Sequence, residues 1–504
     1  MENFALLLEG FETALSLENM LVVTIGALIG LVVGAMPGIG SLEGVALLLP
    51  LTYKLNPTAA IIMLGSLYYS TMYGGGFSAI LLNVPGDPPA VMTAIDGYKM
   101  NIEKKRPGQA LLVSNASSCI GGIIGWIILV ISAPILADFG LKFGPAEMTA
   151  LLLVSMTSIS WLLGDNPVKG LVITMFGILI ACIGMDTLSG SPRYDFGSLY
   201  MLGGIPFTPF VIGGVGFAEI IRLIMETRTP VNITEEDKKR LTIKGSMLTK
   251  HDWKRLMMPS LRGGFLGTFI GVLPGAGATT AAFLGYAIEK NFKSEEPLGS
   301  GAIEGIAACE SANNAASAGS FAPLLALGIP GSGTGAVLLG GLIVFGLNPG
   351  PLLFTNEPEF AWGLMASLFI ANVVALAVSI MIIPWLLKVL AVPAKYMIPS
   401  VTVICAIGAY STSQSMFGVW VMLISGIVGF LLTRFDYPVA PMLLSFVLAP
   451  MLESDMRKAF TISGGSLGIF FDSTISTVLM IILFILILSP IIRSLIKKNK
   501  AKSI

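Results

Sequence analysis

Four Pro-Gly turns interrupt apolar stretches of the chain, in the sequences GAMPGIGS, LLNVPGD, GVLPGAGAT and LGIPGSGT. Proline ends a helix, and glycine lets the backbone bend and approach a ligand closely, so each turn predicts a broken or re-entrant helix. A helix that restarts after such a break directs unpaired amides and the positive end of its dipole toward an anion. The carbonyls that the break releases can bind Na⁺. The turns therefore indicate a site for an anion, a cation or both.

We expect substrate or ion contacts at these turns and in one polar run, CESANNAASAGS. The amides of this run can donate hydrogen bonds to a carboxylate, and their oxygens can bind Na⁺. The candidate residues are Pro37, Gly38, Gly40, Ser41, Asn83, Pro85, Gly86, Pro274, Gly275, Gly277, Thr279, Ser311, Asn313, Asn314, Pro330, Gly331 and Ser332, with Asp87 and Thr334 beside the turns. We expect any Na⁺ ligands to come from the same broken-helix motifs.

Structural roles compete with these functional ones. Glycines at GxxxG spacing pack helices closely, a role that we favour for Gly26, Gly30, Gly263 and Gly267. The polar run can instead form hydrogen bonds between helices. Glu43, Glu304 and Glu310 are alternative carriers of a coupling proton.

Groups that commonly carry catalysis or bind metals are sparse. His251 is the only histidine, and it lies in the charged sequence KHDWKR. The cysteines lie far apart without metal-ligand spacing, at Cys119, Cys182, Cys309 and Cys405. The sequence contains neither a GxxxxGKS/T phosphate-binding loop nor a basic patch interleaved with aromatic residues. We therefore expect no enzyme, no resident cofactor, no ATPase and no nucleic-acid partner.

Composition places these motifs in a membrane. Hydrophobic residues make up 54% of the 504 residues and charged residues only 12%, whereas a typical soluble domain has roughly a quarter charged residues. The mean hydropathy is +0.83. At about 20 apolar residues per crossing, the chain could supply roughly 10 to 12 transmembrane helices. We predict an all-α polytopic membrane protein with broken or re-entrant helices at the Pro-Gly motifs.

Glycine and proline positions of the first half recur in the second half at a constant separation of 237 residues, as between Gly26 and Gly263. The first set is Gly26, Gly30, Gly34, Pro37, Gly38 and Gly40, and the second is Gly263, Gly267, Gly271, Pro274, Gly275 and Gly277. A weaker correspondence aligns YGGGFSAILLNVPGD with AGSFAPLLALGIPGS. We infer two homologous halves.

Charges indicate that the two halves are inverted in the membrane, because Lys and Arg accumulate in cytoplasmic loops. No Lys or Arg precedes Lys54, whereas a basic stretch at 238–255 precedes the second repeat. The basic sequence KMNIEKKR follows the first repeat, and the acidic sequence NEPE follows the second. We therefore predict a periplasmic N-terminus and a cytoplasmic C-terminus. Inverted repeats are typical of secondary transporters.

These patterns divide the chain into five predicted segments. They are an interfacial amphipathic helix at 1–18, a first repeat half at 19–225, a basic cytoplasmic loop at 226–258, a second repeat half at 259–492 and a basic cytoplasmic tail at 493–504.

With these motifs, the sequence resembles the TctA family, the large membrane subunit of tripartite tricarboxylate transporters. The resemblance runs through GALIGLVVGAMPGIG, YYSTMYGGGFSAILLNVPGD, GTFIGVLPGAGAT and ESANNAASAGSFAPLLALGIPG. It implies a bacterial inner-membrane permease that works with a small four-span membrane subunit and a periplasmic solute-binding protein. It also implies import of citrate or related carboxylates, often with Na⁺. The family's Asn-Asn segment falls on Asn313 and Asn314.

We therefore expect an ion-coupled secondary permease for small carboxylates, embedded in membrane lipid, with Na⁺ or H⁺ as the coupling ion. One alternative is a channel or scaffold subunit without coupled transport. A weaker alternative is an intramembrane aspartyl hydrolase, which needs two membrane aspartates that approach each other. Asp87 and Asp165 are the only tempting pair, but neither has a GxGD context, and the paired repeat has no role in such an enzyme.

Overall fold

The computed structural model describes residues 2–36, 39–162, 167–186, 189–225, 241–385 and 394–502. The predicted site residues Pro37 and Gly38 lie outside these ranges, as does Asp165. Contacts divide the chain into two compact units. Unit 1 comprises Met1–Ala137 and Thr208–Phe430, and unit 2 comprises Asp138–Phe207 and Leu431–Ile504. The five predicted segments are defined by sequence repeats and charge rather than by contacts, and they stay a prediction.

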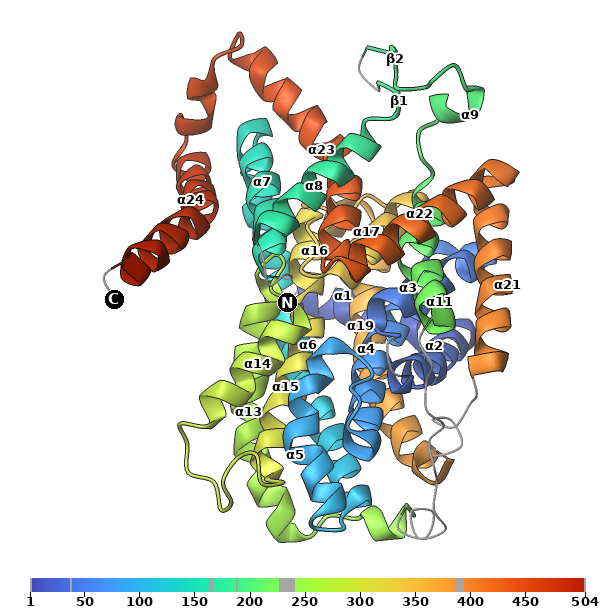
Figure 1. The fold of residues 1–504 in the computed structure, drawn as a ribbon, viewed down its shortest axis with the longest axis vertical. Helices are drawn as coiled ribbons and strands as arrows, with labels where there is room; N and C mark the ends of the chain where they lie inside the picture. The colour runs from blue at the N-terminus through green and yellow to red at the C-terminus, as the bar shows by residue number, and fades with distance from the viewer. Residues whose placement is uncertain are drawn as a thin grey trace. The chain divides into compact units, whose positions relative to one another are not determined.

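Unit 1 consists of helices, several of them short (Figure 1). From the first half of the chain it contains α1 (Glu2–Ala14), α2 (Leu17–Ala35), α3 (Ser41–Leu48), η1 (Leu49–Lys54), α4 (Pro57–Leu82), η2 (Pro88–Ala90), α5 (Val91–Ile102), most of α6 (Pro107–Gly140), α10 (Phe207–Val211), the π-helix η3 (Ile212–Phe217) and α11 (Ala218–Met225). From the second half it contains η4 (Lys244–Ser246), α13 (Lys250–Val272), α14 (Gly277–Glu289), α15 (Ile303–Gly319), α16 (Phe321–Leu327), α17 (Gly333–Val344), α18 (Leu353–Asn356), α19 (Pro358–Ile382), η5 (Ile383–Trp385), α21 (Ala394–Ser413) and most of α22 (Met416–Arg434).

Unit 2 combines helices with one small hairpin. Its elements are α7 (Pro145–Leu162), α8 (Pro167–Ala181), β1 (Gly184–Met185), β2 (Pro192–Arg193), α9 (Leu199–Leu202), α23 (Val439–Ile462), η6 (Leu467–Phe471) and α24 (Thr474–Lys502). The two strands pair antiparallel. Beside them, the buried carboxylate of Asp186 forms an ion pair with Arg457 at 2.9 Å, and Arg193 pairs with Glu453 at 2.7 Å. These ion pairs join the hairpin to α23.

Six helices among the described residues are long and apolar enough to cross a membrane. They are Leu17–Ala35, Pro107–Gly140, Phe207–Met225, Pro358–Trp385, Met416–Arg434 and Val439–Ile462. Shorter apolar helices accompany them at Val168–Ala181, Gly333–Val344, Ile398–Ser413 and Thr474–Leu488. The predicted fold class, an all-α polytopic membrane protein, is confirmed. The long helices are fewer than the roughly 10 to 12 spans expected from composition, because several apolar segments are divided into shorter helices.

Helix ends in unit 1 follow from local capping residues. α4 begins after Asn56, whose side chain accepts a hydrogen bond from the amide of Ala59 at 2.8 Å. Thr249 and Asp252 form a reciprocal capping box at the start of α13. α4 ends at Asn83, which adopts the left-handed conformation with φ 57°. The chain can therefore leave α4 sharply, just before the second Pro-Gly turn.

Backbone-to-backbone packing joins α2 to α4 and α13 to α15. At three glycines of α2 and three of α13, an added methyl group would clash with carbonyl oxygens of the partner helix. These glycines are Gly26, Gly30 and Gly34 in α2, and Gly263, Gly267 and Gly271 in α13. Small residues allow such close approach of helices in membranes. The structure thus supports the packing role that GxxxG spacing indicated.

The same helix pair recurs in both halves of the chain. Ser66 of α4 donates a hydrogen bond to the carbonyl of Val23 at 2.7 Å. Ser311 of α15 donates to the carbonyl of Ser260 at 2.5 Å. Val23 and Ser260 are again 237 residues apart. The packing therefore repeats together with the sequence, while the inverted orientation of the halves in the membrane stays a prediction.

Gly267→Leu should destabilise unit 1 by about 2 to 3 kcal/mol, because the added side chain would meet the backbone of α15, which cannot move aside as a flexible side chain can. Thermal unfolding of the detergent-solubilised protein measures this effect. Gly203→Ala is a control, since its methyl group would have only the Tyr200 carbonyl near it, at 3.9 Å. The control should unfold like the wild type. An unchanged unfolding temperature for Gly267→Leu would contradict this packing.

Candidate functional site

The start of α3 contacts the start of α17. The hydroxyl oxygen of Ser41, the first residue of α3, lies 2.9 Å from that of Thr334, the second residue of α17. Both side chains are buried. Ser41 follows the Pro-Gly turn that opens the first repeat, and Thr334 follows the last turn of the second half. Breaks from the two halves of the chain therefore meet at one buried polar point.

Two carboxylates cap the start of α3. Asp87 accepts a hydrogen bond from the amide of Ser41 at 3.2 Å, and Glu43 accepts one from the amide of Gly40 at 2.8 Å. A methyl group on Gly40 would lie 2.9 Å from a carboxylate oxygen of Asp87, so the carboxylate approaches the Gly40 backbone closely. A methyl group on Gly86 would clash with the end of α2, so the second turn lies directly against the first break. The positive end of α3 is thus held by the protein's own anions.

The start of α14 has no such carboxylate. Its N-cap is Ala276, and no side chain among the described residues caps it. The position that is equivalent to Glu43 by the 237-residue shift is Thr280, a neutral residue. A methyl group on Gly277 would lie 3.7 Å from the side chain of Ser332 at the start of α17, so these two helix starts are also close. The backbone N–H groups at the start of α14 can therefore donate hydrogen bonds to an anion from outside the protein.

Tyr68 of α4 contacts the same site. Its hydroxyl oxygen lies 3.3 Å from that of Ser332, which also caps α17 by accepting a hydrogen bond from the amide of Gly335 at 3.0 Å. Tyr68 is 2% exposed, and its ring lies 6.0 Å from that of Phe321. Sequence pattern alone does not distinguish Tyr68, because a tyrosine among apolar helix residues is typical of a packed core. Because its hydroxyl group faces the start of α17, Tyr68 also contributes a polar group to the site.

The polar run lies on α15, and its side chains form hydrogen bonds mainly with other groups of the protein. The amide of Asn314 donates to Asn313 Oδ1 at 2.5 Å and to the carbonyl of Glu310 at 3.1 Å. The amide of Asn313 donates to the carboxylate of Glu310 at 3.3 Å. Ser311 faces α13 instead, through its bond to Ser260. A substrate or ion contact of Asn313 and Asn314 stays a prediction, and the structure links both residues to Glu310.

The predicted turn residues separate into three groups. Gly40, Ser41, Gly86, Gly277, Gly331 and Ser332 lie at the meeting point of the breaks, as do Asp87 and Thr334. Pro85, Pro274, Gly275 and Pro330 form the turns themselves, and Gly275 and Gly277 have positive φ angles of 81° and 62°. Thr279 is half-buried in the first turn of α14, whereas Asn83 is exposed at the end of α4.

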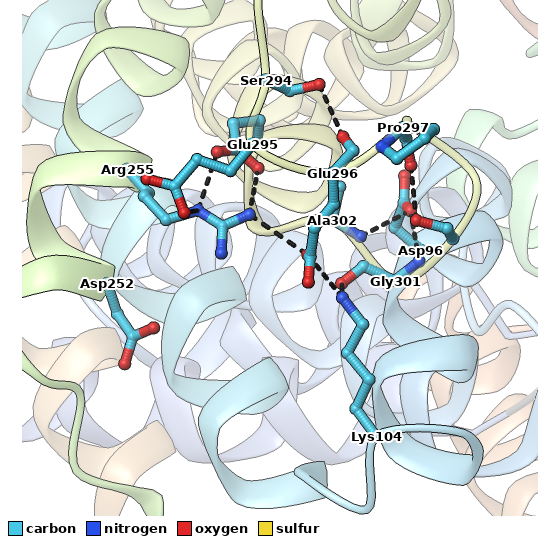
Figure 2. A network of polar contacts seen from close by, with 12 residues as sticks. Asp96, Lys104, Asp252, Arg255, Ser294, Glu295, Glu296, Pro297, Gly301 and Ala302 are labelled. Carbon is cyan, nitrogen blue, oxygen red and sulfur yellow. Dashed lines mark hydrogen bonds and ion pairs between the residues drawn. The ribbon is translucent and has the colours of Figure 1, made fainter.

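Asp96 of α5 binds the loop between α14 and α15 (Figure 2). One oxygen of Asp96 accepts hydrogen bonds at 2.7 to 2.8 Å from three loop amides, those of Gly299, Gly301 and Ala302. Its other oxygen accepts a hydrogen bond from the hydroxyl of Tyr286 at 2.8 Å. A single buried carboxylate therefore fixes the connection that leads into the polar helix α15.

Lys104 and Arg255 hold the same loop through Glu296 (Figure 2). The carboxylate of Glu296 lies 2.5 Å from the Lys104 ammonium and 3.2 Å from the Arg255 guanidinium. Burial by itself raises the pKa of Glu296, but hydrogen bonds from these two cations, together with their charges, lower it below its ordinary value. Arg255 also binds both oxygens of Glu304, at 2.7 and 2.8 Å. Glu304, one of the alternative proton carriers, is thus paired with a cation.

The fold and the site define a polytopic membrane protein whose broken helices meet at a buried polar centre. A family model for the "Tripartite tricarboxylate transporter TctA family" matches residues 20–444. The chain belongs to this family, whose members are transporter subunits rather than enzymes. The resemblance stated from the motifs is confirmed.

Two relatives from Agrobacterium vitis are similar to this chain. An uncharacterised 52.8 kDa protein in the TAR-I ttuC′ 3′ region is 39% identical over 498 residues, which cover 97% of each chain. An uncharacterised protein in the TAR-II ttuC′ 3′ region is 40% identical over 232 residues, covering 45% of this chain and 96% of the relative. No solved structure matches the chain.

Glu296→Gln should make stability less sensitive to acid. The lowered pKa of Glu296 means that its ionised form stabilises the fold. This contribution is complete above the ordinary value of 4.5 and is lost as the pH falls below it through the folded pKa. Thermal unfolding between pH 7 and pH 3 should show the wild type as more stable at pH 7 and the difference vanishing toward pH 3.

Glu295→Gln is the matched control for this series. Glu295 is more exposed than Glu296, and its partners are the exposed His251 at 2.9 Å and Arg255 at 3.6 Å. Exposed ion pairs contribute little, so its loss should change stability less at every pH. A difference between wild type and Glu296→Gln that stays constant from pH 7 to pH 3 would count against the assigned role of Glu296.

Proposed function

We propose that this chain is the large membrane subunit of a bacterial inner-membrane importer for tricarboxylates such as citrate, or for related carboxylates. A periplasmic solute-binding protein delivers the substrate, and a small four-span membrane subunit completes the membrane complex. An ion gradient drives transport, with Na⁺ as the coupling ion in preference to H⁺. The N-terminus lies in the periplasm and the C-terminus in the cytoplasm, as the distribution of Lys and Arg indicates.

The contact between Ser41 and Thr334 carries this proposal. It joins breaks from the two halves of the chain at one buried point. In many secondary transporters, substrate and ion sites lie where broken helices of the two repeats meet. Membership of the TctA family supports the class of transporter.

The chemistry of the two helix starts supports an anionic substrate at α14. At α3, the carboxylates of Asp87 and Glu43 already accept the amide hydrogen bonds and would repel a second anion. At α14, the first turn carries Thr279 and no capping carboxylate among the described residues. A substrate carboxylate can accept hydrogen bonds there from backbone amides and from nearby hydroxyls, including that of Ser332.

Uptake measurements test the proposal. Proteoliposomes that contain this chain and its small membrane partner receive labelled citrate and the binding protein, under a Na⁺ gradient, a proton gradient or no gradient. We expect saturable uptake that requires both the binding protein and the Na⁺ gradient. Uptake that neither saturates nor responds to any gradient would favour the channel alternative, and uptake driven by protons alone would replace Na⁺ as the coupling ion.

Thr334→Val should reduce uptake at subsaturating substrate about tenfold. The change removes the hydroxyl that contacts Ser41 and leaves the buried Ser41 hydroxyl without this partner, at a cost of about 1 to 3 kcal/mol. A cost of about 1.4 kcal/mol corresponds to a factor of ten. Initial uptake rates, normalised to the amount of inserted protein, measure this effect. Ser400→Ala removes an exposed hydroxyl whose one hydrogen bond within the described part of the chain is to the carbonyl of Tyr396, and it should transport normally. Equal rates for wild type and Thr334→Val would contradict the assigned site.

A further inference from the structure

A buried carboxylate lies in the middle of α15, outside the meeting point of the breaks. Glu310 is 0% exposed and accepts hydrogen bonds from three elements. The hydroxyls of Thr93 from α5 and Ser118 from α6 donate to it at 2.5 and 3.0 Å, and the amide of Asn313 donates at 3.3 Å. These donors surround the carboxylate with oxygen and amide groups.

No Lys, Arg or His pairs with Glu310 among the described residues. An ionised carboxylate away from water is costly unless a positive charge compensates it. Neutral hydrogen bonds lower this cost without supplying the charge. Glu310 therefore differs from Glu304, which has Arg255 as a partner.

One more buried hydroxyl oxygen lies beside this carboxylate. Ser114 Oγ is fully buried beside the Glu310 carboxylate and makes no other hydrogen bond among the described residues. A methyl group on Gly76 would lie 2.7 Å from Ser114 Oγ and 3.0 Å from a carboxylate oxygen of Glu310. Both oxygens thus lie side by side against the backbone of Gly76, where a side chain would collide with them. On the same stretch of α6, Ser117 and both polar atoms of Asn115 are buried without partners in the described part of the chain.

We propose that Glu310, Thr93, Ser114 and Ser118 form a binding site for a hard monovalent cation, with Na⁺ as the ligand. This inference rests on the proposed ion-coupled transport and assigns a location to the coupling ion. Carboxylate and hydroxyl oxygens are suitable ligands for hard cations. One carboxylate balances one positive charge, whereas a divalent ion would leave a net charge buried. Four of the surrounding oxygens come from three different helices, so a bound ion would hold these helices together.

Hydrogen bonds along α15 connect this cluster to the breaks. Ser317 donates to the carbonyl of Asn313 at 3.0 Å, and Ser320 donates to the carbonyl of Ser317 at 2.8 Å. A methyl group on Gly331 would lie 3.0 Å from the side chain of Ser320, so the end of α15 lies against the last turn. Glu310 and Ser317 are about 10 Å apart along a helix. A cation at Glu310 would fix α15 and thereby the turn that carries Ser332.

Ion-dependent thermal stability tests the site without requiring transport. Purified protein in detergent is unfolded at pH 7 in mixtures of NaCl and KCl at constant ionic strength. Wild type should become more stable as Na⁺ replaces K⁺, because an ion that binds only the folded state stabilises it in proportion to the logarithm of its concentration above Kd. Glu310→Gln keeps the shape of the side chain and removes its charge, and it should lose the Na⁺-dependent shift.

Gly76→Ala supplies a second variant that leaves the carboxylate intact. Its methyl group would collide with Ser114 Oγ and a carboxylate oxygen of Glu310 and displace them, and it should raise the Na⁺ concentration for half-maximal stabilisation at least tenfold. Ser367→Ala is the matched control, because it removes a buried hydroxyl that, as far as the structure describes the chain, donates to the carbonyl of Leu364 alone. This control should respond to Na⁺ like the wild type.

The possible outcomes test the Na⁺ site separately from the proposed transport function. Equal Na⁺-dependent shifts in wild type, Glu310→Gln and Gly76→Ala would overturn the site, as would the absence of any Na⁺ effect in the wild type. Na⁺-driven carboxylate uptake that persists in Glu310→Gln would also overturn the site while leaving the proposed function intact. A Glu310-dependent Na⁺ shift in a wild type that transports no carboxylate would support the site and count against the proposed function.

Discussion

Close packing of α2 on α4 and of α13 on α15 is the constraint on which the site depends. Glycines let each pair approach backbone to backbone, which places the end of α2 beside Gly75 of α4 and the end of α13 beside Ala316 of α15. In the sequence, three of the Pro-Gly turns follow α2, α4 and α13, and the last follows α16, the short helix after α15. Gly86 lies against the carbonyl of Gly34, and Gly331 lies against that of Gly271. Larger side chains at the packing positions would separate the helices and, with them, the turns that form the polar centre.

The two halves share their packing but differ in the charges at their breaks. Asp87 and Glu43 cap α3, whereas the equivalent positions in the second half are the neutral residues Ser332 and Thr280. The two halves of the repeat thus provide two different helix starts. The start of α3 is capped by carboxyl groups of the protein, whereas the start of α14 can bind an anion from outside the protein. This difference gives a physical basis for separating the proposed substrate contact at α14 from the rest of the site.

The polar helix α15 links the features of unit 1. Its entry is fixed by Asp96 and by the pairing of Arg255 with Glu304. Its middle carries Glu310, and its end lies against the last turn through Ser320. Such a helix, held by hydrogen bonds rather than by apolar contacts alone, has a defined position that ligands can stabilise. In the proposed mechanism, cation binding in its middle and substrate binding beyond its end act on the same rigid element.

The sequence by itself determined the membrane class, the four breaks and the glycine packing, because hydropathy, helix termination by proline and close approach at glycine are local properties. The tertiary structure decided which polar groups meet. Ser41 and Thr334 are far apart in the chain, and only the packing of helices brings them together. The same packing brings the hydroxyls of Thr93 and Ser118 to Glu310 and the hydroxyl of Tyr68 to a helix start. Local patterns cannot specify such partners, since residue type and spacing along one helix do not fix which distant helix faces it.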